Sequence, residues 1–174
     1  MVGRIMSNKP ANKRQKQQGP AGFTLALALV DCLPVLFFSI SFGILTTRFD
    51  SNLLRIGVFL VILAGLLKVG WKFGIALFQK NINVLNLQMR FLMPAGFLLI
   101  LVSLFIDHNK WSWAAIFKHM TTLPAPFFFL GGIVGLGLLI WSAKNSNNQD
   151  AKVNWQEQIV NSFTQFCIMM GILL

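Results

Sequence analysis

The chain has 174 residues, of which 55% are hydrophobic and only 11% are charged, and its net charge is +10. Soluble globular domains carry about 25% charged residues, so this composition excludes an ordinary soluble domain and indicates a small polytopic membrane protein. A charge of +10 would suggest nucleic-acid binding in a soluble protein. Here the basic residues lie mainly at the ends of apolar runs, where they set membrane orientation, and nucleic acid is not an expected partner.

Residues 1–20 form a polar tail rich in Lys, Gln and Asn, and this composition predicts a disordered cytoplasmic segment. Its basic residues are Arg4, Lys9, Lys13, Arg14 and Lys16. Such charges favour the cytoplasmic side and attract anionic lipid headgroups. The apolar run that follows is longer than the 7–15 residues of a signal-peptide core. We therefore expect that run to be retained as a membrane anchor.

Five apolar runs make up residues 21–174, the predicted membrane domain. A helix needs roughly 20 mostly apolar residues to cross a hydrocarbon core of about 30 Å. The predicted spans cover residues 21–47, 52–78, 89–106, 124–141 and 155–174. A short polar turn joins the first two spans, and Asp50 or Ser51 is the predicted cap of the second. Residues 107–123 carry an apolar stripe with Trp111 and Trp113, which predicts an outer amphipathic helix in the headgroup region.

The final run is less apolar than the other four. Gln158, Asn161 and Gln165 recur along it at spacings of three and four, which makes a polar stripe on one helical face. In lipid such a stripe must point into the protein or line water. Two interpretations stay open. The predicted fold is an all-α transmembrane bundle of five spans, or of four spans plus a re-entrant C-terminal helix.

Lys and Arg are distributed unevenly over the predicted loops. If the N-terminus is cytoplasmic, the outer side receives only Arg48, Arg55, Lys110 and Lys118. The cytoplasmic side then receives the tail residues together with Lys72, Lys80, Arg90, Lys144 and Lys152. The excess of positive charge on the inner side favours this orientation. We expect a multi-pass protein of the cell membrane, in particular a bacterial cytoplasmic membrane, because no organelle signal is evident.

Asp31 in the first run and Lys68 in the second are the ionisable residues deepest in the apolar sequence. A charge at the bilayer centre costs several kcal/mol, so such residues usually face the protein interior and have a partner. Each lies ten residues from the cytoplasmic end of its predicted span, which is about 15 Å along a helix. The short turn makes the two spans antiparallel neighbours. We therefore expect an Asp31–Lys68 ion pair, with Gln165 at the same depth.

Three interpretations of these charges stay open. The pair is a structural contact, or it is a site for a proton, an ion or a substrate. In the third interpretation Lys68 extends toward the headgroups and leaves Asp31 protonated.

Small residues are spaced for close helix packing. Gly57 and Gly65 lie on one face of the second span, and two Gly-x-x-x-Gly motifs occur at Gly70–Gly74 and Gly131–Gly135. Glycines at this spacing let two helix backbones approach closely. We expect packing within the chain rather than dimerisation.

Chemical motifs are few. The sequence has no recognisable Ser-His-Asp set or paired carboxylates, and Cys32 and Cys167 fall in apolar runs without nearby histidines. We expect no metal site, no cofactor and no evident catalytic centre. The favoured function is a small transporter-like unit, or an accessory subunit with a membrane-protein partner. The alternatives are a membrane-embedded enzyme acting on a lipid or quinone, and a scaffold that docks a partner through its basic tail.

Overall fold

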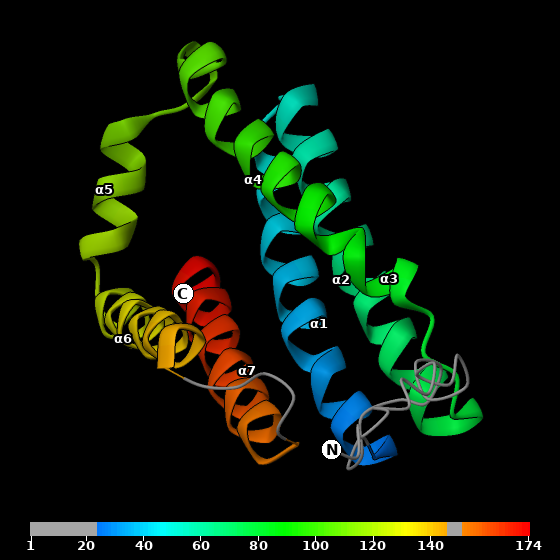
Figure 1. Cartoon of the computed structure of the whole chain (residues 1–174). Helices are drawn as coiled ribbons and strands as arrows, with labels where there is room; N and C mark the ends of the chain where they lie inside the picture. The colour runs from blue at the N-terminus through cyan, green and yellow to red at the C-terminus, as the bar shows by residue number, and fades with distance from the viewer. Residues whose placement is uncertain (1–23, 146–150) are drawn as a thin grey trace, which may run out of the picture.

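The computed structural model describes residues 24–145 and 151–174. These residues are 89% helical and include no strand, which confirms the all-α fold class. The helices, drawn in Figure 1, are α1 (Leu25–Arg48), α2 (Asn52–Phe78), α3 (Asn83–Leu87), α4 (Met89–Ile106), the 3-10 helix η2 (His108–Lys110), α5 (Trp113–Thr121), α6 (Ala125–Asn145) and α7 (Ala151–Leu173). The tail predicted over residues 1–20 lies outside the described residues.

Four segments among the described residues are long and apolar enough to cross a membrane. They are α1, α2, the combined α3–α4 segment and the first 18 residues of α6. The 23-residue α7 is similar in length, but it is not one of the four. Its polar stripe lowers its hydropathy, as the sequence predicts. A separate helix, α5, forms within the predicted amphipathic segment, and none of its residues is buried.

Side-chain caps fix the starts of the first two helices. The Thr24 hydroxyl accepts a hydrogen bond from the Leu27 N–H at 3.3 Å, so α1 begins at Leu25 rather than at residue 21. The Ser51 hydroxyl accepts from the Leu54 N–H at 3.1 Å and caps α2, which confirms one of the two predicted caps. Such a cap satisfies a backbone donor that the helix itself leaves unpaired.

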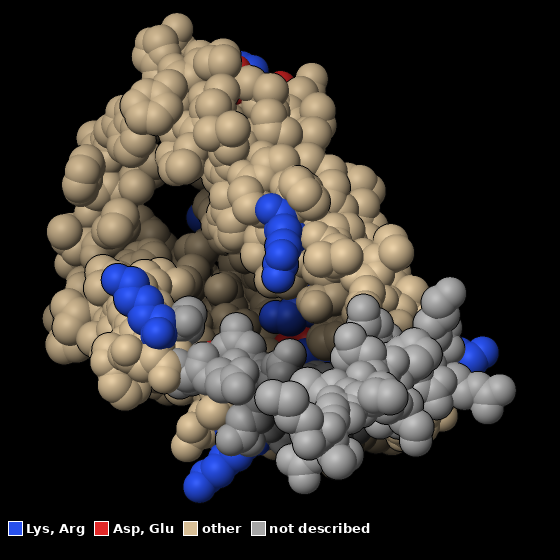
Figure 2. All heavy atoms as spheres, in the orientation of Figure 1, with Lys and Arg blue, Asp and Glu red and all other residues tan. Residues whose placement is uncertain are grey.

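The long helices pack side by side in the order α4, α2, α1, α7, α6. The row is curved, and α5 joins α4 at one end of it to α6 at the other (Figure 1). Figure 2 shows the opening that α4, α5 and α6 frame. The curvature places α4 and α7 on the same concave face, although they are not a packed pair.

Glycines form the closest crossings between neighbouring helices. A Cβ on Gly96 of α4 would lie 2.8 Å from the Gly57 carbonyl oxygen of α2 and 2.7 Å from a Val61 methyl. Gly131 and Gly135 of α6 pack against α7, where a Cβ on Gly135 would overlap the Thr164 hydroxyl. The prediction for the Gly131–Gly135 motif is therefore confirmed.

The Gly70–Gly74 motif does not make a helix crossing in the described part of the chain. A Cβ on Gly70 would meet no atom within 4 Å, and one on Gly74 would meet only the Lys80 carbonyl oxygen at 3.7 Å. The packing prediction for this motif is wrong, because Gly70 lies on an exposed part of the α2 surface.

A polar corner ties the α1–α2 turn to the end of α4. The Ser51 hydroxyl donates to Asp107 Oδ2 at 2.5 Å, and Lys110 Nζ lies 3.2 Å from Asp107 Oδ1. The Ser51 hydrogen bond, followed by that of Lys110, holds the pKa of Asp107 below its ordinary value. Phe49 stacks on Trp111 beside this corner, with ring centroids 4.0 Å apart.

A candidate binding cavity beside a buried ion pair

A buried ion pair joins α1 to α2. Lys72 Nζ lies 3.0 Å from Asp31 Oδ1, and the two side chains are 2% and 5% exposed. The predicted Asp31–Lys68 pair is thereby corrected, since the partner is one helical turn further along α2. Asp31 lies six residues after the start of α1 at Leu25, and Lys72 lies six residues before the end of α2 at Phe78. Both are about 9 Å from the helix ends, so they meet at the same depth.

The ion pair leaves hydrogen-bonding capacity unused. Asp31 Oδ2 and Lys72 Nζ are both buried without a well-directed hydrogen bond to a described residue. The 3.0 Å contact between Lys72 Nζ and Asp31 Oδ1 is therefore held mainly by the attraction between opposite charges. Buried carboxylates usually have all their acceptors satisfied, because desolvation of an unpaired oxygen is costly. Asp31 Oδ2 is thus an acceptor without a donor in the part of the chain that the structure describes.

A cavity of about 230 Å³ lies beside the pair, and α1, α2, α4 and α7 line it. Its polar lining consists of Asp31, Lys68, Asn161 and Gln165. The structure therefore brings together the three residues predicted to share one layer, Asp31, Lys68 and Gln165, and adds Asn161 from the polar stripe. Figure 2 shows basic and acidic atoms deep in a hollow on this face of the molecule.

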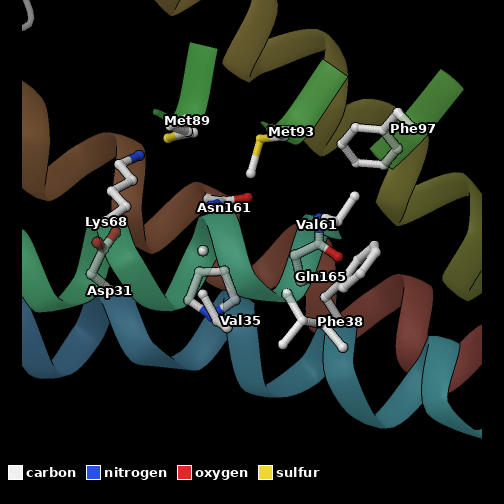
Figure 3. Close-up of a pocket in the computed structure, with 13 residues that line it drawn as sticks. Asp31, Val35, Phe38, Val61, Lys68, Met89, Met93, Phe97, Asn161 and Gln165 are labelled. Atoms are coloured by element: carbon white, nitrogen blue, oxygen red, sulfur yellow. The ribbon is translucent and has the colours of Figure 1, made fainter. Parts of the chain in front are cut away.

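The rest of the cavity wall is apolar. Met89, Met93 and Phe97 line it from α4, and Val35 and Phe38 line it from α1 (Figure 3). No sequence pattern indicated the α4 wall. Its position depends on the Gly57–Gly96 crossing, which is a tertiary contact.

Lys68 has a different environment from Lys72. It is half-buried, it lines the cavity, and it forms none of the ion pairs found among the described residues. In Figure 3 its side chain extends away from Asp31 toward Met89. The carboxylate that could neutralise it is already bound to Lys72. Lys68 is therefore a cation at the cavity wall without a bonded counter-ion among the described residues.

Other polar residues of α7 lie outside this cavity. Gln158 is 4% exposed, and its Oε1 atom is buried without a hydrogen-bond partner among the described residues. Gln158 is not part of the cavity wall. Glu157 accepts a hydrogen bond from the Ser142 hydroxyl at 2.9 Å. Its negative charge also interacts with Lys72, as does the positive charge of Lys68.

A second cavity, of about 420 Å³, lies beneath α5 and is lined mostly by apolar and aromatic side chains. His119 on its wall hydrogen-bonds through Nε2 to the Gly171 carbonyl at 3.0 Å. No set of three His, Cys, Asp or Glu side chains in residues 24–145 and 151–174 is grouped to hold a metal ion.

No family model, curated protein or solved structure matches the chain.

Proposed function

We propose that this chain is a multi-pass protein of the cell membrane that acts as a small transporter-like unit and binds its solute in the cavity beside Asp31. The observation that carries the proposal is the cavity itself, which meets two ionisable side chains within otherwise apolar helices. Charged residues at such depth mark substrate and ion pathways when they face a cavity. A protein that used Asp31 and Lys72 only as a structural contact would have no need of a cavity beside them.

The proposed membrane arrangement has five spans and a cytoplasmic N-terminus. The distribution of Lys and Arg supports the orientation, and the bacterial cytoplasmic membrane is the proposed location. For α7 the support comes from its two faces. Gln158 and Thr164 are buried, whereas Ile159 and Phe163 are 57% and 59% exposed. A polar face turned inward and an apolar face turned outward suit a fifth span that its neighbours shield.

The enzyme alternative has less support. It would need several polar groups converging near the headgroup plane, around Lys72, Arg90 and Asn154. Lys72 is held by Asp31, and Arg90 is exposed on α4. The proposed role is therefore binding and movement of a solute rather than bond-making or bond-breaking.

One observation favours an accessory subunit as the second candidate. The apolar windows of α3–α4 and α6, which end the helix row, are each only 17% buried. Partner helices of a larger complex would cover such faces, as lipid would. In either role, we propose that the basic tail contacts anionic headgroups.

Cysteine accessibility tests the proposal. In a background with Cys32→Ser and Cys167→Ser, Gln165→Cys is placed in proteoliposomes and exposed to a membrane-impermeant thiol reagent on either side. Ile159→Cys, on the exposed apolar face of α7, is the matched control. We expect modification at position 165 from both sides and none at position 159. Modification from one side only would exclude translocation, and no modification at position 165 would exclude an aqueous cavity.

A further inference from the structure

From the charges around the cavity we infer that its ligand is an anionic amphiphile, with one carboxylate or phosphate group attached to an apolar chain. This inference rests on the proposed function, because it names the class of solute for the same cavity. Four charged groups lie in this region: Lys68 and Lys72 are cationic, and Asp31 and Glu157 are anionic. Of the four, Asp31 and Lys68 line the cavity, and Lys72 already neutralises Asp31 at 3.0 Å. Lys68 is left to bind an anion.

A cationic ligand fits this cavity poorly. A cationic ligand could approach Asp31 Oδ2, which lacks a hydrogen-bond donor among the described residues. It would then lie beside the Lys72 ammonium group, which is bound to the same carboxylate, in a cavity that the Lys68 side chain also lines. Like charges brought close together in a partly buried site repel each other. Asp31 Oδ2 instead suits a neutral donor, such as water or a hydroxyl group.

The direction of Lys68 places the anion near α4. Its side chain extends away from Asp31 toward Met89 (Figure 3). A carboxylate or phosphate at that position would contact the ammonium group without approaching the Asp31 carboxylate. The amide groups of Asn161 and Gln165, which line the same cavity, can donate further hydrogen bonds.

The apolar wall suits a hydrocarbon chain. Met89, Met93 and Phe97 line the cavity from α4, and methionine side chains adapt their shape to different apolar ligands. The volume of about 230 Å³ is below the roughly 300–1,000 Å³ of complete small-molecule pockets. It holds a headgroup and the first carbons. The rest of a chain can leave between α4 and α7, which are not a packed pair.

The test uses the full-length protein in nanodiscs of zwitterionic lipid. Binding of dodecanoate, dodecyl phosphate, dodecanol and dodecyltrimethylammonium is measured by calorimetry. One hydrogen bond to a charged group corresponds to roughly 10–100-fold in affinity. We expect the two anions to bind about 10–100-fold more tightly than dodecanol. Lys68→Gln should remove this preference, whereas Lys68→Arg should retain it.

Lys80→Gln is the matched control, because Lys80 is an exposed lysine beyond the end of α2. It should keep the full preference for anions. The affinity of a short-chain phosphatidylglycerol is measured as well. If it binds more tightly than dodecanoate, the ligand is a phospholipid, and if dodecanoate binds more tightly, the ligand is a free carboxylate. Equal affinity for anion and alcohol, or tighter binding of the cation, would overturn the inference. If Gln165→Cys were still modified from both sides, those outcomes would leave the proposed function intact.

Discussion

Replacing Lys72 with Met should destabilise the protein far more than the same change at Lys68. The Asp31 residue is 4% exposed, and its only ion-pair partner among the described residues is Lys72. Removing one partner of a buried pair costs about 3–5 kcal/mol, because the other charge stays buried without compensation. Lys68 is half-buried and forms no ion pair with a described residue, so its loss should cost less than about 1 kcal/mol.

Protonation of the Asp31 carboxylate limits the loss of stability expected for Lys72→Met. Protonating an ordinary aspartate at pH 7 costs about 4 kcal/mol. Asp31 would therefore become protonated if keeping its uncompensated charge buried cost more than this. The expected loss for Lys72→Met is therefore about 3–4 kcal/mol. Adding Asp31→Asn should recover part of it, because the double variant buries no charge at this position.

The assay is reversible unfolding in mixed micelles, in which the free energy of unfolding is compared for the wild type, Lys72→Met, Lys68→Met and the double variant. Both lysine variants remove one positive charge from α2, so a general charge effect would be the same in each. Equal losses for the two, or a larger loss for Lys68→Met, would refute the assignment of Lys72 as the buried partner.

Three further predictions concern packing and pH. Gly96→Ala should cost about 1–3 kcal/mol in the same assay because the new methyl overlaps α2, whereas Gly70→Ala, with open space around it, should be neutral or slightly stabilising. Gly135→Ala should likewise destabilise, through overlap with α7, and a stability equal to that of Gly70→Ala would contradict the described crossing. The Ser51 hydrogen bond lowers the pKa of Asp107, so this carboxylate stabilises the fold above its ordinary pKa and the contribution disappears as pH falls through the lowered pKa. Asp107→Asn should flatten the acid side of a melting temperature–pH profile, and an unchanged slope would disprove the linkage.

Local signals in the sequence predicted the elements and the layer of the site. Asp50 and Ser51 lie in a polar turn just before an apolar run, which is enough to predict a cap at one of them, and the cap is Ser51. The polar spacing along α7 predicted that Gln165 would face inward, and Gln165 does line the cavity with Asp31 and Lys68. Each of these depends on periodicity within one segment or on depth along a helix.

The partner of Asp31 could not be predicted in this way. The prediction depended on where each helix starts and ends, and the Thr24 cap moves the start of α1 toward Asp31. Lys68 and Lys72 are four residues apart on the same face of α2. An error of about one helical turn in the depth of Asp31 therefore replaces Lys72 with Lys68 as its predicted partner. The α4 wall of the cavity, which includes Met93, could not be predicted for a different reason. Its position is set by a crossing between two helices, which no pattern within a single helix specifies.

The measurement that tests the central claim most directly is the magnetic dipolar coupling between lysine ¹⁵Nζ and aspartate ¹³Cγ in liposomes, recorded by solid-state NMR. Lys68→Arg and Lys72→Arg each remove one labelled lysine while keeping the positive charge. Lys110 and Asp107, 3.2 Å apart, give a coupling that neither variant changes. The 3.0 Å separation of Lys72 Nζ and Asp31 Oδ1 predicts a second coupling that persists in Lys68→Arg and disappears in Lys72→Arg. A coupling lost in Lys68→Arg and retained in Lys72→Arg would contradict both the ion pair and the anion site derived from it.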